Sequence, residues 1–213
     1  VLELPGGRLP FDLAGPTSGA ATGSSSGAAA AVVLVHGFGL DRRMWEPQWA
    51  PLADRRRVLR YDLRGFGPAG ELDPSVPYTH AADLLTLLDH VGIDLAVVVG
   101  LSYGGHVALQ TALAAPDRVC AIVLMDALVE GVPWDRPSAD AAREAARLAR
   151  AEGLDAARSA WLAHPLFESA PSAPAAADLL RRMVADYPGQ HWLGLDPHLA
   201  ETAPLDRLAE LRM

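Results

Sequence analysis

The pattern G-x-S-x-G marks the residue of this chain that is best suited to chemistry. The sequence reads GLSYG over residues 100–104, with Ser102 at its centre. A serine hydroxyl held at a sharp turn can attack a carbonyl carbon once a base takes its proton. Glycine two residues before and after the serine avoids the collisions that a side chain would make in such a turn. The spacing therefore predicts a nucleophile elbow with Ser102 as the attacking group.

The flanking residues predict the elements that would hold this turn. Residues 95–99 form a short, β-branched apolar run typical of a buried strand. Residues 106–113 favour a helix, which ends before Pro116. A strand, a turn and a helix place the serine at a helix amino end, where the dipole stabilises developing negative charge. The alternative is an ordinary glycine-rich turn with an incidental serine.

The rest of the chain predicts the layout around this turn. Further strands are expected at residues 31–35, 57–61 and 119–125, and a leading hairpin from residues 1–4 and 9–13. Helices are expected at 41–53 and 79–91, so strands and helices alternate through short loops. This alternation predicts an α/β fold, a mostly parallel sheet with helices on both faces.

The chain changes in character after residue 126. Helical patterns follow at 138–152, 154–163 and 173–187, with no strand pattern between them, and a last short helix at 204–211. We interpret this as a helical lid over the site. The expected division is a core at residues 1–127, a lid at 128–203 and a return to the core at 204–213.

Composition narrows the functional classes. The net charge of −8 argues against nucleic acid or an anionic membrane as the partner. The 18 basic residues are all arginine, and without lysine a P-loop or a pyridoxal Schiff base is excluded. No histidine cluster has metal-ligand spacing, and no apolar run is long enough to span a bilayer. We expect a cytoplasmic protein with a small-molecule substrate, no metal and no cofactor; the oligomeric state stays open.

Three motifs, each after a predicted strand, resemble those of the α/β-hydrolase superfamily. They are HGFG at residues 36–39, DLRGFG at 62–67 and GLSYGG at 100–105. Their spacing is most similar to small lidded esterases, enol-lactonases and carbon–carbon hydrolases, and the resemblance is strongest over residues 31–127. It implies that Ser102 is the nucleophile and that the backbone N–H groups of Phe38 and Tyr103 form the oxyanion hole. It makes His36 a residue that orients its loop, not a base.

The resemblance also requires an acid and a histidine after the serine in chain order. Asp126 follows the strand after the elbow, where some family members keep the acid; the alternative is a turn residue at the entry to the lid. His164, His191 and His198 fall in lid loops and are expected at the surface or lining a pocket. The chain ends where a further strand should begin. We therefore expect a fragment whose last strands are missing, with the acid and histidine beyond residue 213 and a raw, poorly soluble sheet edge.

These observations favour a cofactor-free serine hydrolase acting on a small ester, lactone or related carbonyl compound. A non-catalytic small-molecule-binding protein of the same fold is the first alternative, and a cofactor-free haloperoxidase-like enzyme is the second. A dinucleotide-binding domain does not fit, because position 102 is serine where the pattern G-x-G-x-x-G needs glycine. The same serine excludes an aspartate-nucleophile dehalogenase or epoxide hydrolase.

Overall fold

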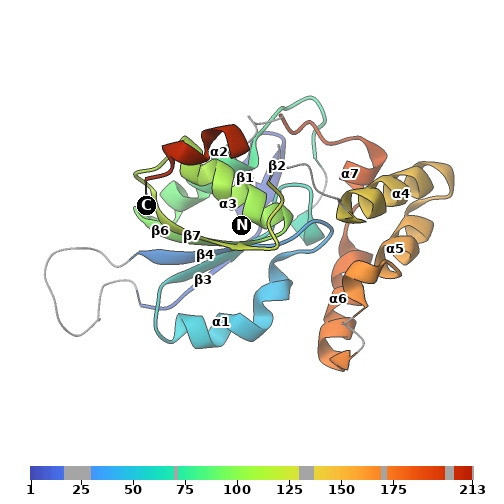
Figure 1. Ribbon diagram of the computed structural model, residues 1–213, viewed down its shortest axis with the longest axis horizontal. Helices are drawn as coiled ribbons and strands as arrows, with labels where there is room; N and C mark the ends of the chain where they lie inside the picture. The colour runs from blue at the N-terminus through green and yellow to red at the C-terminus, as the bar shows by residue number, and fades with distance from the viewer. Residues whose placement is uncertain (17–29, 70–71, 130–136, 169–171, 200–203, 213) are drawn as a thin grey trace, which may run out of the picture.

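The computed structural model describes residues 1–16, 30–69, 72–129, 137–168, 172–199 and 204–212 (Figure 1). Its centre is a five-stranded sheet in the order β3-β5-β4-β6-β7, in which only β3 runs antiparallel to its neighbour. The α/β fold with a mostly parallel sheet is therefore confirmed. The strands are β3 (Phe11–Ala14), β4 (Ala31–Val35), β5 (Val58–Tyr61), β6 (Ala96–Leu101) and β7 (Val119–Met125).

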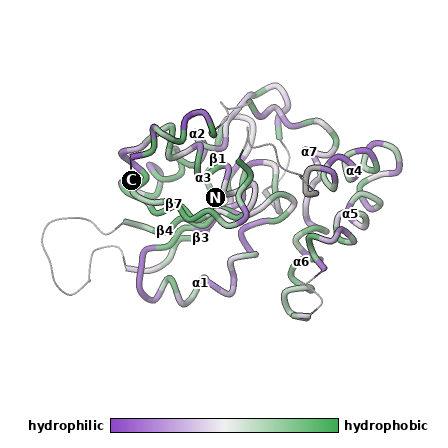
Figure 2. The backbone as a smooth tube through the Cα atoms, in the orientation of Figure 1, coloured by the Kyte–Doolittle hydropathy of each residue, from purple (hydrophilic) through white to green (hydrophobic). Residues whose placement is uncertain are grey.

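Helices cover both faces of this sheet because successive strand residues point to opposite sides. Val33 and Val35 of β4 belong to the larger core, which α2 (His80–His90) and α3 (Tyr103–Ala114) cover. Leu34 packs on the other face with Trp45 and α1 (Glu46–Ala53), which lies below the sheet in Figure 1. Figure 2 shows the resulting concentration of hydrophobic residues in the strands.

The predicted leading hairpin is only partly correct. β1 (Leu2–Leu4) pairs antiparallel with β2 (Gly7–Leu9), but the chain beyond Pro10 leaves this hairpin. Pro10 has no N–H to continue a ladder, and its carbonyl instead accepts a hydrogen bond from the Asp62 N–H at 2.8 Å. Phe11 onward becomes β3 and joins the main sheet beside β5.

The helices after β7 gather beside the sheet, at the right of Figure 1. They are α4 (Pro137–Ala151), α5 (Leu154–Leu162), α6 (Pro174–Asp186) and α7 (Gln190–Leu193). Ala141, Ala145 and Ala149 repeat every fourth residue on the buried face of α4, in the same apolar cluster as the sheet. The predicted boundary at 203 lies outside the described residues, and the division into core and lid stays a prediction. The last predicted helix is a 3-10 helix, Pro204–Glu210, against α3.

Strand β7 lies at one edge of the described sheet. Its residues Val123, Leu124 and Met125 are 46%, 40% and 43% exposed. An apolar edge strand of this kind favours association between molecules. Within the described ranges, no helix is both long and apolar enough to cross a membrane.

A buried ion pair joins the turn after β5 to α2. The Arg64 guanidinium donates to both carboxylate oxygens of Asp83, at 2.8 and 2.5 Å, and the two side chains are 4% and 7% exposed. We expect Asp83→Asn to lower the free energy of unfolding by about 3 kcal/mol, because it leaves a buried cation without its counter-charge. Urea denaturation measures the loss.

Asp89→Asn is the matched control for this prediction. Asp89 lies on the same helix as Asp83, and its carboxylate, which is 67% exposed, pairs with Arg118 at 2.7 Å. An exposed pair contributes less than about 1 kcal/mol. Equal losses in the two variants would contradict the structural role given to Asp83.

Candidate active site

Ser102 occupies the turn between β6 and α3 in a backbone conformation that side chains rarely adopt, with φ 51° and ψ −112°. Its N–H donates to the Met125 carbonyl of β7 at 2.8 Å. Its carbonyl accepts from the N–H groups of Gly105 at 3.0 Å and Leu128 at 3.2 Å. The strained residue is thus fixed by hydrogen bonds from neighbouring segments, as expected where strain serves a function.

Two glycines make this turn possible by close approach of backbone to backbone. A Cβ atom at Gly100 would lie 2.2 Å from the Gly104 carbonyl oxygen. A Cβ atom at Gly104 would lie 2.3 Å from the carbonyl oxygen of Val35, at the end of β4. The predicted need for glycine on both sides of Ser102 is confirmed.

The Ser102 side chain is available for chemistry. A serine at a helix amino end usually caps the helix, but Ser102 forms no such bond with α3. Its hydroxyl makes no hydrogen bond to any residue that the structure describes, and the residue is only partly buried. The hydroxyl therefore stands at the positive end of α3 with its hydrogen-bonding capacity unused by the described chain.

The loop after β4 carries Phe38. The Leu40 N–H donates to the Gly37 carbonyl at 3.2 Å and closes a turn in which Gly39 has φ 71°, a value that favours glycine. The Phe38 N–H donates to no residue within the described ranges. The Phe38 and Tyr103 rings meet edge to face at 6.0 Å, so the structure brings the two predicted oxyanion-hole residues side by side.

Both ring nitrogens of His36 form hydrogen bonds to the backbone, which supports a structural role for this residue. Its Nδ1 donates to the Gly37 carbonyl at 2.9 Å, and its Nε2 accepts from the Leu63 N–H at 2.9 Å. Burial lowers the pKa of His36 to about 4, so the ring is neutral, as this pattern requires. It joins the loop after β4 to the turn after β5.

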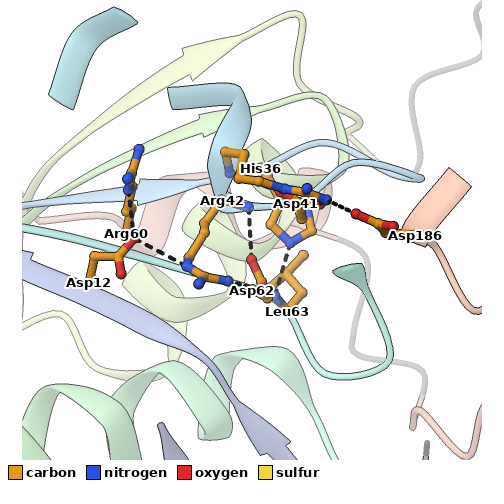
Figure 3. A network of polar contacts seen from close by, with 9 residues as sticks. Asp12, His36, Asp41, Arg42, Arg60, Asp62, Leu63 and Asp186 are labelled. Atoms are coloured by element: carbon orange, nitrogen blue, oxygen red, sulfur yellow. Dashed lines mark hydrogen bonds and ion pairs between the residues drawn. The ribbon is translucent and has the colours of Figure 1, made fainter. Parts of the chain in front are cut away.

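A network of ion pairs holds the same loop from its far end (Figure 3). The buried Asp62 carboxylate accepts from the Arg42 N–H at 2.8 Å and from its guanidinium at 2.5 Å. Arg43 donates to Asp41 at 2.6 Å and to Asp186 at 2.8 Å. Because Asp186 ends α6, the second arginine connects the Phe38 loop to the helices after β7.

Asp126 lies directly after β7, beside the elbow, with φ 50° and an exposed side chain. It makes no hydrogen bond to a histidine among the described residues. His164 caps a 3-10 helix, Pro165–Phe167, where its Nδ1 accepts from the Leu166 N–H at 3.2 Å. The backbone N–H of His106 donates to the Ser102 carbonyl at 3.2 Å, but within the described ranges no histidine ring is hydrogen-bonded to the Ser102 hydroxyl.

The sequence did not predict that a group of rings, which we call the ring cage, meets around Phe38. Phe38 meets each of its members edge to face, with centroids 5.4–6.1 Å apart. The members are Phe66, Tyr103, Trp161, Tyr187 and His191. The last three lie on or beside α5, α6 and α7, about 120 to 150 residues away in the sequence, and no local pattern signals their meeting.

A second polar connection runs from the ring cage to the core. His191 Nδ1 is 2.8 Å from the Tyr187 hydroxyl, and its Nε2 is 3.4 Å from Asp196. The Tyr78 hydroxyl donates to Asp196 at 2.7 Å.

The described residues contain no group of three or more acidic, histidine or cysteine side chains that could hold a metal ion.

The strain at Ser102 gives a stability prediction. We expect Ser102→Gly to be more stable than Ser102→Ala by about 1 kcal/mol, because glycine adopts φ 51° without steric cost. Thermal unfolding of the two variants measures the difference. The same pair of changes at Ser159, inside α5, should give the opposite order, since glycine costs about 1 kcal/mol in a helix. The same order at both sites would show that Ser102 is unstrained.

Acid should weaken the packing of His191. Burial lowers the pKa of His191 to about 4; His198 and His36 lower it further, while Asp196 raises it. Between about pH 6.5 and 4 the unfolded histidine takes up a proton that the folded one does not, so acid favours unfolding. We expect the free energy of unfolding of the wild type, minus that of His191→Phe, to fall by about 2 kcal/mol from about pH 7 to about pH 5. Urea denaturation of both proteins at the two pH values measures this change. Phenylalanine at position 191 keeps a ring stacked on Phe66. If the stability difference between the two proteins did not change with pH, His191 would not be the group responsible.

The sheet, the elbow and the loop after β4 together define the class of the protein as an α/β hydrolase. The model of the alpha/beta hydrolase family matches residues 32–212, and the chain belongs to this family.

Named relatives agree with this class. "Putative carbamate hydrolase RutD" from Caulobacter vibrioides is 37% identical over 108 residues, which are 50% of this chain and 38% of that protein. A thermophilic esterase from Thermogutta terrifontis superposes with a TM-score of 0.71 and 30% identity, over 96% of this chain and 71% of the esterase. The enol-lactonase from Burkholderia xenovorans LB400 superposes with a TM-score of 0.68 and 26% identity, over 96% of this chain and 75% of the enol-lactonase. Over the matched stretch with RutD, the chain covers well under half the length of this curated relative.

Proposed function

We propose that this protein is a serine hydrolase that acts on a small ester, lactone or related carbonyl compound. Ser102 is the nucleophile, and the backbone N–H groups of Phe38 and Tyr103 hold the oxyanion. The observation that carries the proposal is the Ser102 hydroxyl itself, held on a strained turn at the amino end of α3 without a hydrogen bond to the described chain. The names of the esterase and the enol-lactonase support the substrate class.

The reaction would proceed in two steps. The Ser102 oxygen attacks the carbonyl carbon while a base takes its proton, and the carbonyl oxygen becomes the oxyanion. The oxyanion collapses, the alkoxide leaves with that proton, and water then cleaves the acyl-serine by the same route. Histidine is the base that suits a serine nucleophile near neutral pH. Since no described histidine ring is hydrogen-bonded to the Ser102 hydroxyl, activity is to be measured on the full-length product of the gene.

The helices α4 to α7 would act as a lid in this proposal. They carry Trp161, Tyr187 and His191 onto the Phe38 loop, which surrounds the reacting carbonyl with apolar surface and excludes water. The proposed reaction requires no cofactor and no metal.

Asp126 is kept as a candidate for the acid that orients the base. Its place after β7, one strand from Ser102, supports this role, since the Ser102 N–H bonds to the residue before it. If Asp126 is this acid, Asp126→Asn should lower kcat by about 10⁴-fold. A turn residue with no catalytic role would leave kcat of Asp126→Asn close to the wild type.

A substrate panel tests the proposal. The full-length gene product would be assayed with 4-nitrophenyl acetate, butyrate and octanoate, γ-butyrolactone and a phenyl carbamate. We expect hydrolysis of the short esters or the lactone above the rate of the Ser102→Ala variant. A folded wild type that hydrolyses none of them but binds them would instead favour the non-catalytic binding protein. Bromination that requires peroxide and Ser102 would favour the haloperoxidase-like enzyme.

A further inference from the structure

The side chain of Phe38 is held mainly by rings that do not belong to the sheet. Two rings of the cage, Phe66 and Tyr103, come from the core, at 5.4 and 6.0 Å from Phe38. The other three come from the α5 to α7 region, at 5.7 to 6.1 Å. The residue whose N–H is proposed to hold the oxyanion therefore depends on these helices for its placement.

Trp161 makes the most direct contact with this loop. A Cβ atom at Gly39 would lie 2.9 Å from Trp161 Nε1 and 3.2 Å from its Cε2, so the indole rests on the backbone next to Phe38. Trp161 is 4% exposed, and its buried Nε1 has no hydrogen-bond partner among the described residues. Packing alone holds the indole, between its own helix and the turn.

We propose that Trp161 is a positioning residue for the oxyanion hole, through which α5 sets the direction of the Phe38 N–H. This inference rests on the proposed function. A turn anchored on one side by His36 and on the other by an indole can hold its amide in a fixed direction. Without the indole the turn loses one support, and a misplacement of about 1 Å at a reacting group costs about 100-fold in rate.

The expected signature is a loss in kcat without a matching rise in KM. An oxyanion forms only in the transition state, so a misdirected donor weakens transition-state binding more than ground-state binding. We expect Trp161→Ala to lower kcat by about 100-fold while KM changes by less than about 3-fold. Trp161→Phe keeps a ring against the turn and should restore kcat to within about 10-fold of the wild type.

Trp192 provides the matched control. It is 1% exposed, its buried Nε1 also has no hydrogen-bond partner in the part of the chain that the structure describes, and it lies in the same apolar cluster. Within the described chain, its ring meets those of Trp161 and Tyr187 but not that of Phe38. Trp192→Ala removes the same side chain from the same region and should lower the melting temperature similarly, with kcat within about 5-fold of the wild type.

A second pair of variants tests the contact from the loop side and covers the case in which Trp161→Ala does not fold. Gly39→Ala places a methyl group against the indole at φ 71°. Gly92→Ala imposes similar backbone strain at φ 64°, but its new methyl group would have no described atom within 4 Å. Only Gly39→Ala should lower kcat, again by about 100-fold.

The experiment measures kcat and KM for 4-nitrophenyl acetate, the rate of reaction with a fluorophosphonate, and the melting temperature, on full-length gene product. Equal kcat losses in Trp161→Ala and Trp192→Ala, or in Gly39→Ala and Gly92→Ala, would overturn the inference while leaving the proposed function in place. A loss that appears in KM alone would also overturn it. A folded wild type no more reactive than Ser102→Ala would overturn the proposed function and this inference with it.

Discussion

Replacing Ser102 with alanine is expected to reduce ester hydrolysis by the full-length gene product to the background rate, a loss on the order of 10⁶-fold in kcat. Removal of the nucleophile leaves only binding and oxyanion stabilisation, which act weakly without an attacking group. The fold should survive, because the backbone bonds that fix residue 102 involve its N–H and carbonyl and not its hydroxyl. Initial rates with 4-nitrophenyl acetate, beside circular dichroism of both proteins, measure the effect.

Ser159→Ala is the control for this experiment. The Ser159 hydroxyl donates to the Asp155 carbonyl of its own helix at 2.8 Å and lies on an exposed position of α5. Its removal should change kcat by less than about 2-fold. Substantial hydrolysis by folded Ser102→Ala would show that the attacking group is elsewhere.

Replacing Gly104 with alanine is expected to destabilise the protein by about 3 kcal/mol or more. Helix propensity alone predicts the opposite, a gain of about 1 kcal/mol for alanine within a helix. The contact decides the sign, because the new Cβ would lie 2.3 Å from the Val35 carbonyl oxygen and 2.5 Å from that of His36. These are backbone atoms at the end of β4, and they cannot move aside as a flexible side chain can.

Urea denaturation of Gly104→Ala, with Gly92→Ala as the reference for an open glycine position, measures this cost. The displaced helix would also shift Ser102 relative to Phe38, so labelling by a fluorophosphonate should fall together with stability. A Gly104→Ala protein as stable and as reactive as the wild type would contradict the close approach of α3 to β4.

The sheet and the elbow were predictable from the sequence because local signals define them. The apolar runs that became β4, β6 and β7 are short, rich in β-branched residues and bounded by turns, and the glycines around Ser102 have a steric reason to be there. The helix after the elbow begins at Tyr103, three residues before the expected start. Its first turn contains Gly104, which lies against the backbone at the end of β4, where a larger residue would not fit. The hairpin prediction failed at Pro10, where the partner strand β5 comes from about 50 residues further along the chain.

The surroundings of Phe38 could not be predicted in the same way. Trp161, Tyr187 and His191 reach it only through the packing of α4 to α7 against the sheet, and helix periodicity gives a buried face but not its partner. The ion pair from Arg43 to Asp186 and the bond from Tyr78 to Asp196 have the same character, since each joins residues more than 110 positions apart. Such contacts depend on the tertiary arrangement, and the inference about Trp161 rests on one of the same kind, the approach of its indole to Gly39.

The most direct test of the account is to identify the residue that a fluorophosphonate modifies in the full-length gene product. Intact-mass analysis followed by peptide mapping should find a single adduct on the Ser102 hydroxyl, formed faster than the adduct on any other serine and absent from Ser102→Ala. A folded protein that forms no adduct, or that carries it on another residue while Ser102 stays unmodified, would contradict the assignment of Ser102 as the nucleophile.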